Sequence, residues 1–224
     1  MQRQTRYRCS ARFYDVISAE WPVYRGGRIA AINLMALRPG HRVLDIGCGT
    51  GLNFSQLQQR IGPGGSITGV DASPQMLAQA QRRVDSAGWH NVQLILADAT
   101  ALDLAALKAA ALPPGAGFDS VISTYALSLM PDWSEAISLM IAACRPAGRV
   151  AVVDMQNPVG GAAVWTPVAK LACLLGGSDI DAHPWTAIES SLTDVDAVSL
   201  RGGHIQVRVG SVPEPGRIPS LRSR

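Results

Sequence analysis

The sequence has few cysteines, and none is spaced to pair with another or to share a metal. The four are Cys9, Cys48, Cys144 and Cys173. They form no Cys-x-x-Cys pair, so we expect reduced, buried thiols in a cytoplasmic protein rather than a disulfide framework or a zinc site. The four histidines are equally scattered. Because they give no metal-ligand spacing, we expect no metal.

The sequence also lacks a long apolar run and a strong net charge. No stretch reaches the roughly 18 uninterrupted apolar residues of a membrane-spanning helix. The longest candidate, 159–175, is interrupted by glycines, a proline and a lysine. Residues 1–12 carry four arginines but no apolar core of a secretory signal. The formal net charge of +3 is too small to indicate a nucleic-acid partner.

What is present is the composition of a globular domain, with 47% hydrophobic and 17% charged residues in a chain of 224. Apolar patterns predict strands at 42–46, 66–71, 91–97, 118–123 and 149–155. They predict helices at 28–37, from near 50 to 61, and at 73–87, 102–111 and 131–144. Strands and helices that alternate with short connections are typical of a doubly wound α/β fold, a parallel sheet with helices on both faces.

The C-terminal part departs from this alternation. Residues 160–175 and 184–191 have helical patterns, and two strand-like segments, 192–200 and 204–212, are joined by a Gly-Gly turn. A hairpin makes the last strand antiparallel to its neighbour.

We expect a single domain, 1–212. Its parts are an N-terminal arm and helix (1–40), a cofactor-binding core (41–155), a helical insertion on the substrate side (156–191) and the hairpin (192–212). Residues 213–224 are expected to form a disordered tail.

The stretch 43–51 joins the first predicted strand to the helix after it. It reads Val-Leu-Asp-Ile-Gly-Cys-Gly-Thr-Gly. Glycines permit positive φ and a close approach of a ligand to the main chain. The free N–H groups of the helix N-terminus add donors. The stretch is therefore typical of a nucleotide-binding turn.

Two residues decide between possible nucleotides. A dinucleotide site needs a third glycine at position 52, where this chain has leucine. Asp45 would repel a pyrophosphate in a partly buried site. S-adenosylmethionine has no phosphate and carries an ammonium and a sulfonium, which a carboxylate favours.

Two further carboxylates end neighbouring strands. Asp71 ends the second strand, where an acid can bind ribose hydroxyls. Asp98 ends the third, where it can accept from an adenine amino group. Because ligands of open α/β sheets bind at the carboxyl ends of the strands, the three aspartates predict one adenosyl site.

On these residues the sequence resembles the class I S-adenosyl-L-methionine-dependent methyltransferases. The matching stretches are 43–51, 69–77 (Gly-Val-Asp-Ala-Ser-Pro-Gln-Met-Leu), 97–99 and 145–152, and the resemblance covers about residues 13–155. The Tyr14-Asp15 lead-in is similar to the ubiquinone/menaquinone C-methyltransferases and the related phospholipid N-methyltransferases. The resemblance implies a Rossmann-like, seven-stranded, mostly parallel sheet whose last strand is antiparallel.

The resemblance also implies roles for individual residues. The main chain of Gly47, Cys48 and Gly49 would line the methionine part of the cofactor, with Thr124 near it. Asp71 and Ala72 would hold the ribose, and Asp98 and Ala99 the adenine. Met76 belongs to the second matching stretch and is a further candidate. Tyr14 and Tyr24 would either cover the cofactor or only anchor the N-terminal arm.

Methyl transfer is an in-line displacement, so the protein mainly contributes proximity, alignment and exclusion of water. A hydroxyl or carbon acceptor would need a base, whereas a neutral amine would not. The candidate catalytic residues are Tyr125 and His183. The alternatives are packing at the sheet edge for Tyr125 and capping of the following helix for His183.

The sequence thus predicts a methyltransferase, monomeric or homodimeric, acting on a small-molecule, quinone or lipid-like acceptor. A peripheral membrane contact through the apolar face near Trp165 stays open beside a core role for that face. Two alternatives remain: an aminocarboxypropyl transferase that uses the same cofactor, and a non-catalytic cofactor-binding protein.

Overall fold

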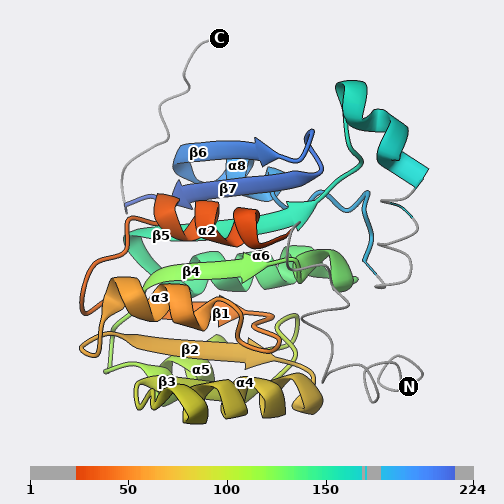
Figure 1. Ribbon diagram of the computed structural model, residues 1–224. Helices are drawn as coiled ribbons and strands as arrows, with labels where there is room; N and C mark the ends of the chain where they lie inside the picture. Colours follow the sequence, from red (N-terminus) through yellow and green to blue (C-terminus); the bar gives the residue numbers. More distant parts are fainter. Residues whose placement is uncertain (1–23, 168–169, 171–177, 215–224) are drawn as a thin grey trace.

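The computed structural model describes residues 24–167, 170 and 178–214 (Figure 1). Its centre is a seven-stranded sheet in the order β3-β2-β1-β4-β5-β7-β6. The strands are β1 (Arg42–Ile46), β2 (Ser66–Asp71), β3 (Val92–Leu96), β4 (Phe118–Thr124), β5 (Cys144–Met155), β6 (Thr193–Leu200) and β7 (Ile205–Ser211). Neighbours among β1 to β5 are parallel, and β7 is antiparallel to both β5 and β6. The predicted fold class and the antiparallel last strand are confirmed.

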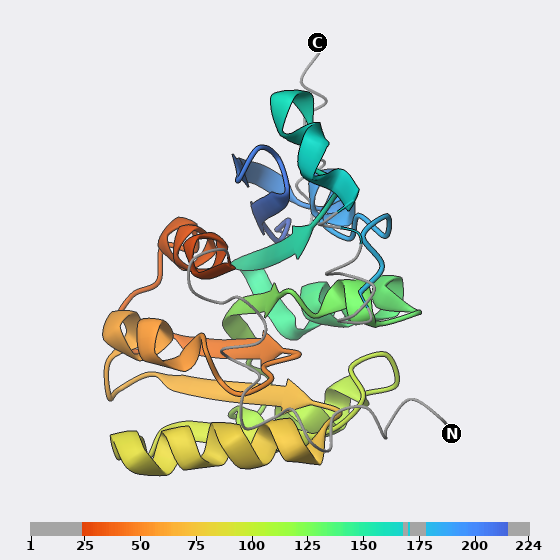
Figure 2. The ribbon, with the colours of Figure 1, turned by 45° about the vertical axis from the view of Figure 1, so that its right-hand side comes forward.

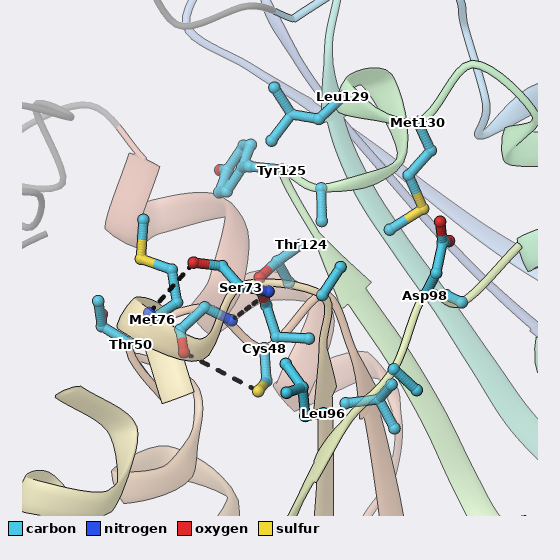
Figure 3. Close-up of a pocket in the computed structure, with 18 of the residues that line it drawn as sticks. Cys48, Thr50, Ser73, Met76, Leu96, Asp98, Thr124, Tyr125, Leu129 and Met130 are labelled. Atoms are coloured by element: carbon cyan, nitrogen blue, oxygen red, sulfur yellow. Dashed lines mark hydrogen bonds between the residues drawn. The ribbon is translucent and has the colours of Figure 1, made fainter. Parts of the chain in front are cut away.

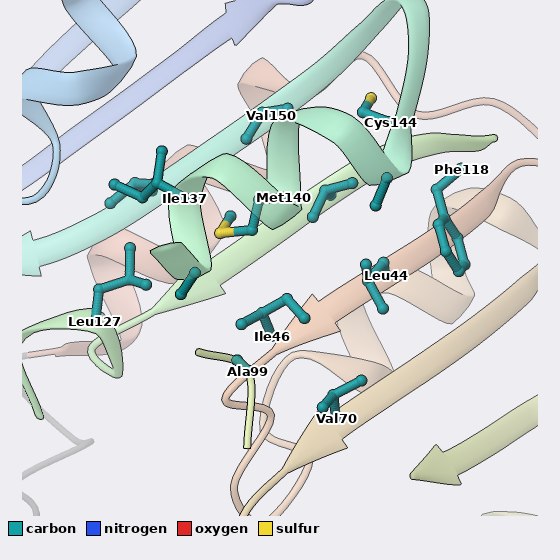
Figure 4. Packing of buried hydrophobic residues seen from close by; sticks show 14 of the residues in the cluster. Leu44, Ile46, Val70, Ala99, Phe118, Leu127, Ile137, Met140, Cys144 and Val150 are labelled. Atoms are coloured by element: carbon teal, nitrogen blue, oxygen red, sulfur yellow. The ribbon is translucent and has the colours of Figure 1, made fainter. Parts of the chain in front are cut away.

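Helices cover both faces of this sheet (Figure 2). One face carries α2 (Arg25–Leu34), α3 (Phe54–Ile61) and α4 (Pro74–Ala87). The other carries α5 (Leu104–Ala111), α6 (Trp133–Ala143) and α8 (Thr186–Ser191). Side chains alternate along the strands, so that Val43 packs under the first set and Leu44 under the second. Figure 4 shows the second core, a buried cluster to which Leu44, Ile46 and Phe118 of the sheet and Met140 of α6 belong.

Capping explains where the helices begin and end. The Ser73 hydroxyl accepts a hydrogen bond from Met76 N at 3.3 Å, and Gly88 closes α4 with a φ of 65°. Helix α5 begins at Leu104 rather than 102 because the Asp103 carboxylate accepts from Ala105 N and Ala106 N. Helix α2 ends before the predicted residue 37, since Ala36 takes a positive φ of 50°.

Three other elements differ from the prediction. Helix α3 begins at Phe54 instead of near residue 50, because 48–54 form turns closed by Gly51 N to Cys48 O and Phe54 N to Gly51 O. Strand β5 begins at Cys144 instead of 149, because Cys144 pairs with Phe118 before a bulge. The helix predicted at 160–175 is described only in part, as the 3₁₀ helix η4 (Gly160–Trp165), which stands away from the sheet (Figures 1 and 2).

Within the described residues, no helix is long and apolar enough to cross a membrane. In the same residues, no group of three or more His, Cys, Asp or Glu could hold a metal ion. The disordered tail predicted for 213–224 lies mostly outside the described residues.

Helix α2 approaches the sheet closely at Gly27, and this contact gives a testable prediction. A Cβ on Gly27 would lie 2.9 Å from both Ile205 Cγ2 and Val153 Cγ1 and would collide with the Tyr125 hydroxyl. We expect Gly27→Ala to lower the free energy of unfolding by about 1–3 kcal/mol, as overpacking does. Urea denaturation would measure the change.

The neighbouring Gly26 supplies the matched control. A Cβ there would meet only Leu200 Cδ1, at 3.8 Å. Because alanine is the better helix former, Gly26→Ala should be neutral or stabilising by up to about 1 kcal/mol. Equal effects of the two substitutions would contradict the close approach at Gly27.

Candidate functional site

A cavity of about 1050 Å³ opens at the carboxyl ends of β1 to β4 (Figure 3). Ten of the residues predicted for the site line it: Gly47, Cys48, Gly49, Asp71, Ala72, Met76, Asp98, Ala99, Thr124 and Tyr125. The two segments that supply most of them, 47–49 and 71–76, follow adjacent strands. The cavity is therefore a product of the strand order and of where each strand ends.

The glycine turn is tied to the end of β2 by its backbone. Gly47 N and Cys48 N both donate to Val70 O, at 2.8 and 3.0 Å. Gly47 has a φ of 66°, and a Cβ on it would collide with the Cβ of Ala126. Gly49 has a φ of 55° with no atom within 4 Å of a Cβ position. The turn is thus packed on one side and open on the cavity side.

Asp71 is held by two backbone amides. Its Oδ2 accepts from Gly49 N at 2.9 Å, and its Oδ1 accepts from Ser73 N at 2.8 Å. Burial raises the pKa of Asp71, and these two hydrogen bonds act in the opposite direction. A carboxylate has about four acceptor positions. Its two oxygens can therefore accept further hydrogen bonds from hydroxyl groups of a ligand.

The far end of the cavity combines an exposed carboxylate with an exposed apolar surface. Asp98 Oδ1 accepts from Thr100 N at 2.9 Å and from Thr100 Oγ1 at 2.7 Å, which fixes the carboxylate at the rim. Leu96 also lines the cavity, and 59% of it is exposed. A large exposed leucine beside an oriented acceptor suits a flat ring that carries an amino group.

Asp45 does not lie on the cavity surface. It is fully buried, and its Oδ2 accepts from Asn53 Nδ2 at 2.9 Å, while its Oδ1 has no hydrogen-bond partner. Burial raises the pKa of Asp45 to about 7, against the lowering effects of Asn53 and Arg28. The prediction that Asp45 would contact the ligand overlooked Asn53, whose Nδ2 donates both to Asp45 Oδ2 and to Oγ1 of Thr124, a residue of the cavity lining.

Arg28 lines the cavity and was absent from the predicted site. Its Nη1 donates to Asn53 Oδ1 at 3.2 Å and makes a short hydrogen bond to Thr124 Oγ1. The sequence carried a signal for it: Arg28 precedes Ala31, Ile32 and Met35 at the spacing of one helix face, and those three are buried. An arginine on an apolar face marks a position where the face meets a polar site.

Tyr125 follows β4 with a positive φ of 57° and lines the cavity. Its hydroxyl donates to Tyr24 O at 2.8 Å, and the two rings lie 4.9 Å apart. The Arg28 guanidinium carbon lies 5.1 Å from the centre of the Tyr125 ring. The backbone, the hydroxyl and a cation–π contact therefore fix this side chain.

His183 is not part of the cavity lining. Its ring lies 4.8 Å from the ring of Trp185, and its carbonyl accepts from Thr186 N and Thr186 Oγ1 at the start of α8. The side chain of His183 does not cap α8 either, because the N-cap residue is Trp185 and the helix start has no side-chain hydrogen bond. Tyr14, the remaining predicted residue, lies outside the described residues.

One wall of the cavity is apolar and was also not predicted. It consists of Ala126, Leu129, Met130 and Pro131, which come from the loop between β4 and α6. Within it, Leu127–Leu129 form the 3₁₀ helix η3. In Figure 3 this wall extends from the neighbourhood of Tyr125 to that of Asp98.

Comparisons with known proteins agree with the resemblance found in the sequence. A family model described as "Methyltransferase domain" matches residues 37–175. A demethylmenaquinone methyltransferase of Listeria welshimeri is 32% identical over 131 residues, which are 58% of this chain and 52% of the relative. A phosphatidylethanolamine N-methyltransferase of Cereibacter sphaeroides is 34% identical over 116 residues, 51% of each chain. The chain thus spans about half the length of these curated relatives.

Solved structures share the fold. Phosphoethanolamine N-methyltransferase 2 of Haemonchus contortus, in complex with phosphomonomethylethanolamine and S-adenosylhomocysteine, aligns with a TM-score of 0.68 and 16% identity. The alignment covers 92% of this chain and 59% of that one.

The raised pKa of Asp45 predicts a pH dependence of stability. A carboxyl whose pKa in the folded state is about 7, above the ordinary 3.8, favours the folded state when protonated and loses that contribution as the pH rises through 7. Asp45→Asn imitates the protonated form. We expect the variant to melt a few degrees above the wild type at pH 8, with the difference shrinking towards pH 5.

Asp119 provides a control of opposite sign. Hydrogen bonds from Arg42 and Arg145 keep its pKa below the ordinary value despite some burial. Asp119→Asn should therefore melt below the wild type by an amount that stays constant between pH 8 and pH 5. A difference for Asp45→Asn that does not change with pH would refute the assignment.

Proposed function

Since the chain belongs to the methyltransferase-domain family of class I S-adenosyl-L-methionine-dependent enzymes, we propose that it transfers a methyl group from that cofactor to a small-molecule, quinone or lipid-like acceptor. The observation that carries the proposal is the convergence of the open glycine turn, Asp71 and Asp98 on one cavity.

The residues that line the cavity fit this cofactor better than they fit a dinucleotide. Leu52, which also lines the cavity, occupies the place of the third glycine of a dinucleotide site. Two carboxylates, those of Asp71 and Asp98, and one guanidinium, that of Arg28, line the cavity. Such a surface favours a ligand with an ammonium and a sulfonium over one with two phosphates.

Each part of the cofactor has a matching group. Asp71 would accept from the ribose hydroxyls, and Asp98 would accept from the adenine amino group, with the ring against Leu96. The glycine turn and Thr124 would hold the methionine part. Arg28 would attract its carboxylate.

When bound, the cofactor supplies an electrophilic methyl group whose leaving group departs without charge. The protein would then contribute alignment and a dry environment. Tyr125 is proposed to act through its ring, which lines the cavity, because its hydroxyl already donates to the Tyr24 carbonyl. In this role Tyr125 orients the acceptor.

The apolar wall supports an acceptor with an apolar body. Ala126, Leu129 and Met130 could accommodate a quinone ring or the apolar part of a lipid. Two relatives are named for demethylmenaquinone and phosphatidylethanolamine, which are molecules of this kind. Val159 and Val164, 55% and 75% exposed at η4, would suit a peripheral contact with the membrane in which such acceptors lie.

Binding and product analysis test the proposal. Titration calorimetry with S-adenosylmethionine and S-adenosylhomocysteine should give binding by the folded protein, and NAD should give none. Incubation with quinol or phosphatidylethanolamine vesicles should release S-adenosylhomocysteine. Methylthioadenosine as the product would instead indicate aminocarboxypropyl transfer, and tight binding of NAD would overturn the cofactor assignment.

Asp71 gives the sharpest test of the ribose position. Hydrogen bonds to a charged group contribute about 1.5–3 kcal/mol each, so Asp71→Ala should weaken cofactor binding about 10- to 100-fold for each hydroxyl bond that is lost. Calorimetry would measure the affinity, and circular dichroism would check the fold. Asp85→Ala, on the exposed far end of α4, is the control and should leave the affinity unchanged. Equal affinities of Asp71→Ala and wild type would disprove the ribose assignment.

A further inference from the structure

Asp154 is a fully buried carboxylate at the end of β5 that does not line the cavity. Its Oδ2 accepts from Ser128 N at 2.9 Å. Its Oδ1 accepts from Ser128 Oγ at 2.8 Å and from Met155 N at 2.9 Å. One side chain thus binds both polar donors of Ser128, which fixes the position of that residue and its orientation.

Ser128 is the middle residue of η3, and this short helix carries the apolar wall. Leu127, on one side of Ser128, is 1% exposed and belongs to the core. Leu129 and Met130, on the other side, line the cavity (Figure 3). This helix of three residues has only two backbone hydrogen bonds of its own, from Leu129 N to Ala126 O and from Met130 N to Leu127 O, and these do not fix its orientation against the sheet. The bonds to Asp154 supply what the helix itself lacks.

The same residue also connects the wall to a second segment. The carbonyl of Ser128 accepts from Asp179 N at 2.8 Å, and Asp179 Oδ1 in turn accepts from Asp181 N at 3.0 Å. Asp181 Oδ1 accepts from Asn157 Nδ2 at 2.8 Å, just beyond β5. A closed path therefore runs from β5 through Ser128 and the 179–181 loop back to the residues after β5.

Burying the Asp154 carboxylate costs free energy of folding, so stability alone does not explain why a carboxylate is found there. Burial raises the pKa of Asp154 to about 6, which the hydrogen bonds from Ser128 and Met155 only partly offset. An apolar pair of similar volume would fill the space with less loss of solvation. What an apolar pair could not do is hold the amide and hydroxyl of Ser128 at one fixed place.

We propose that Asp154 is a positioning residue that, through Ser128, sets the wall of Leu129 and Met130 against the bound cofactor and acceptor. The purpose of the wall rests on the proposed function. The dependence of the wall on Asp154 does not, and it can be measured without any ligand.

Two substitutions test separately the hydrogen bonds that Asp154 accepts from the amide and from the hydroxyl of Ser128. Asp154→Asn can keep one oxygen for Ser128 Oγ and Met155 N, but its amide nitrogen then faces the N–H of Ser128, a donor against a donor. Ser128→Ala removes the hydroxyl bond and leaves the amide bond. We expect cofactor affinity to fall about tenfold in Asp154→Asn and about threefold in Ser128→Ala. The ¹³C-methyl resonance of Met130 should shift in both without ligand.

Asp119→Asn is the matched control. Asp119 also accepts a backbone N–H, that of Arg42 at 2.8 Å, but it lies at the opposite end of the sheet. This variant should lower the melting temperature while leaving the affinity and the Met130 resonance unchanged. Such a result separates positioning of the wall from general loss of stability.

Each outcome of these measurements either supports or overturns the inference. Wild-type affinity together with an unmoved Met130 resonance in folded Asp154→Asn would overturn the inference. If Asp154→Asn does not fold, Ser128→Ala decides by the same two measurements. If the wild type does not bind the cofactor, the proposed function fails, and the Met130 resonance alone then supports or refutes the role of Asp154.

Discussion

The hydrogen bonds from Gly47 N and Cys48 N to the carbonyl of Val70 are the constraint on which the cavity depends. They stop β1 at a fixed place relative to β2, so that the glycine turn and Asp71 face each other. The next bond, from Gly49 N to the Asp71 carboxylate, then orients the acidic side chain. Backbone geometry decides the position of the site before any side chain of the cavity contributes.

Strands β1 and β2 at the centre of the sheet were the best-predicted part of the fold, and the reason is physical. Residues 42–46 and 66–71 form β1 and β2, whose inner residues are buried on both faces of the sheet, and each segment ends at a turn. Helix starts were harder to place. At α5 the side chain of Asp103 decided the first residue, and at α3 the turn at Gly51 delayed it. The spacing of apolar residues says little about which residue caps a helix and therefore about where the helix begins.

The residues of the candidate site also differ in how well the sequence predicts them. Groups attached to strand ends, such as Gly49, Asp71 and Asp98, could be predicted because the parallel sheet brings strand ends together. Arg28 and the wall of Leu129 and Met130 could not, since helix packing and a loop bring them to the cavity. Asp45 was predicted as a ligand contact from its charge and its place before the first glycine, and the sequence did not show that it would be buried and bonded to Asn53.

Helix α2 has a consequence for the order in which the chain can fold. It packs against β5 and β7 through Gly27, and Leu34 O accepts a hydrogen bond from Arg149. Among the described elements, α2 precedes all seven strands in the chain, whereas β7 is the last of them. Part of the surface on which the helix that carries Arg28 packs therefore forms only after β7 has been synthesised and has joined the sheet. The side of the cavity that carries Arg28 is therefore completed only once β7 has joined the sheet, later in the chain than the glycine turn.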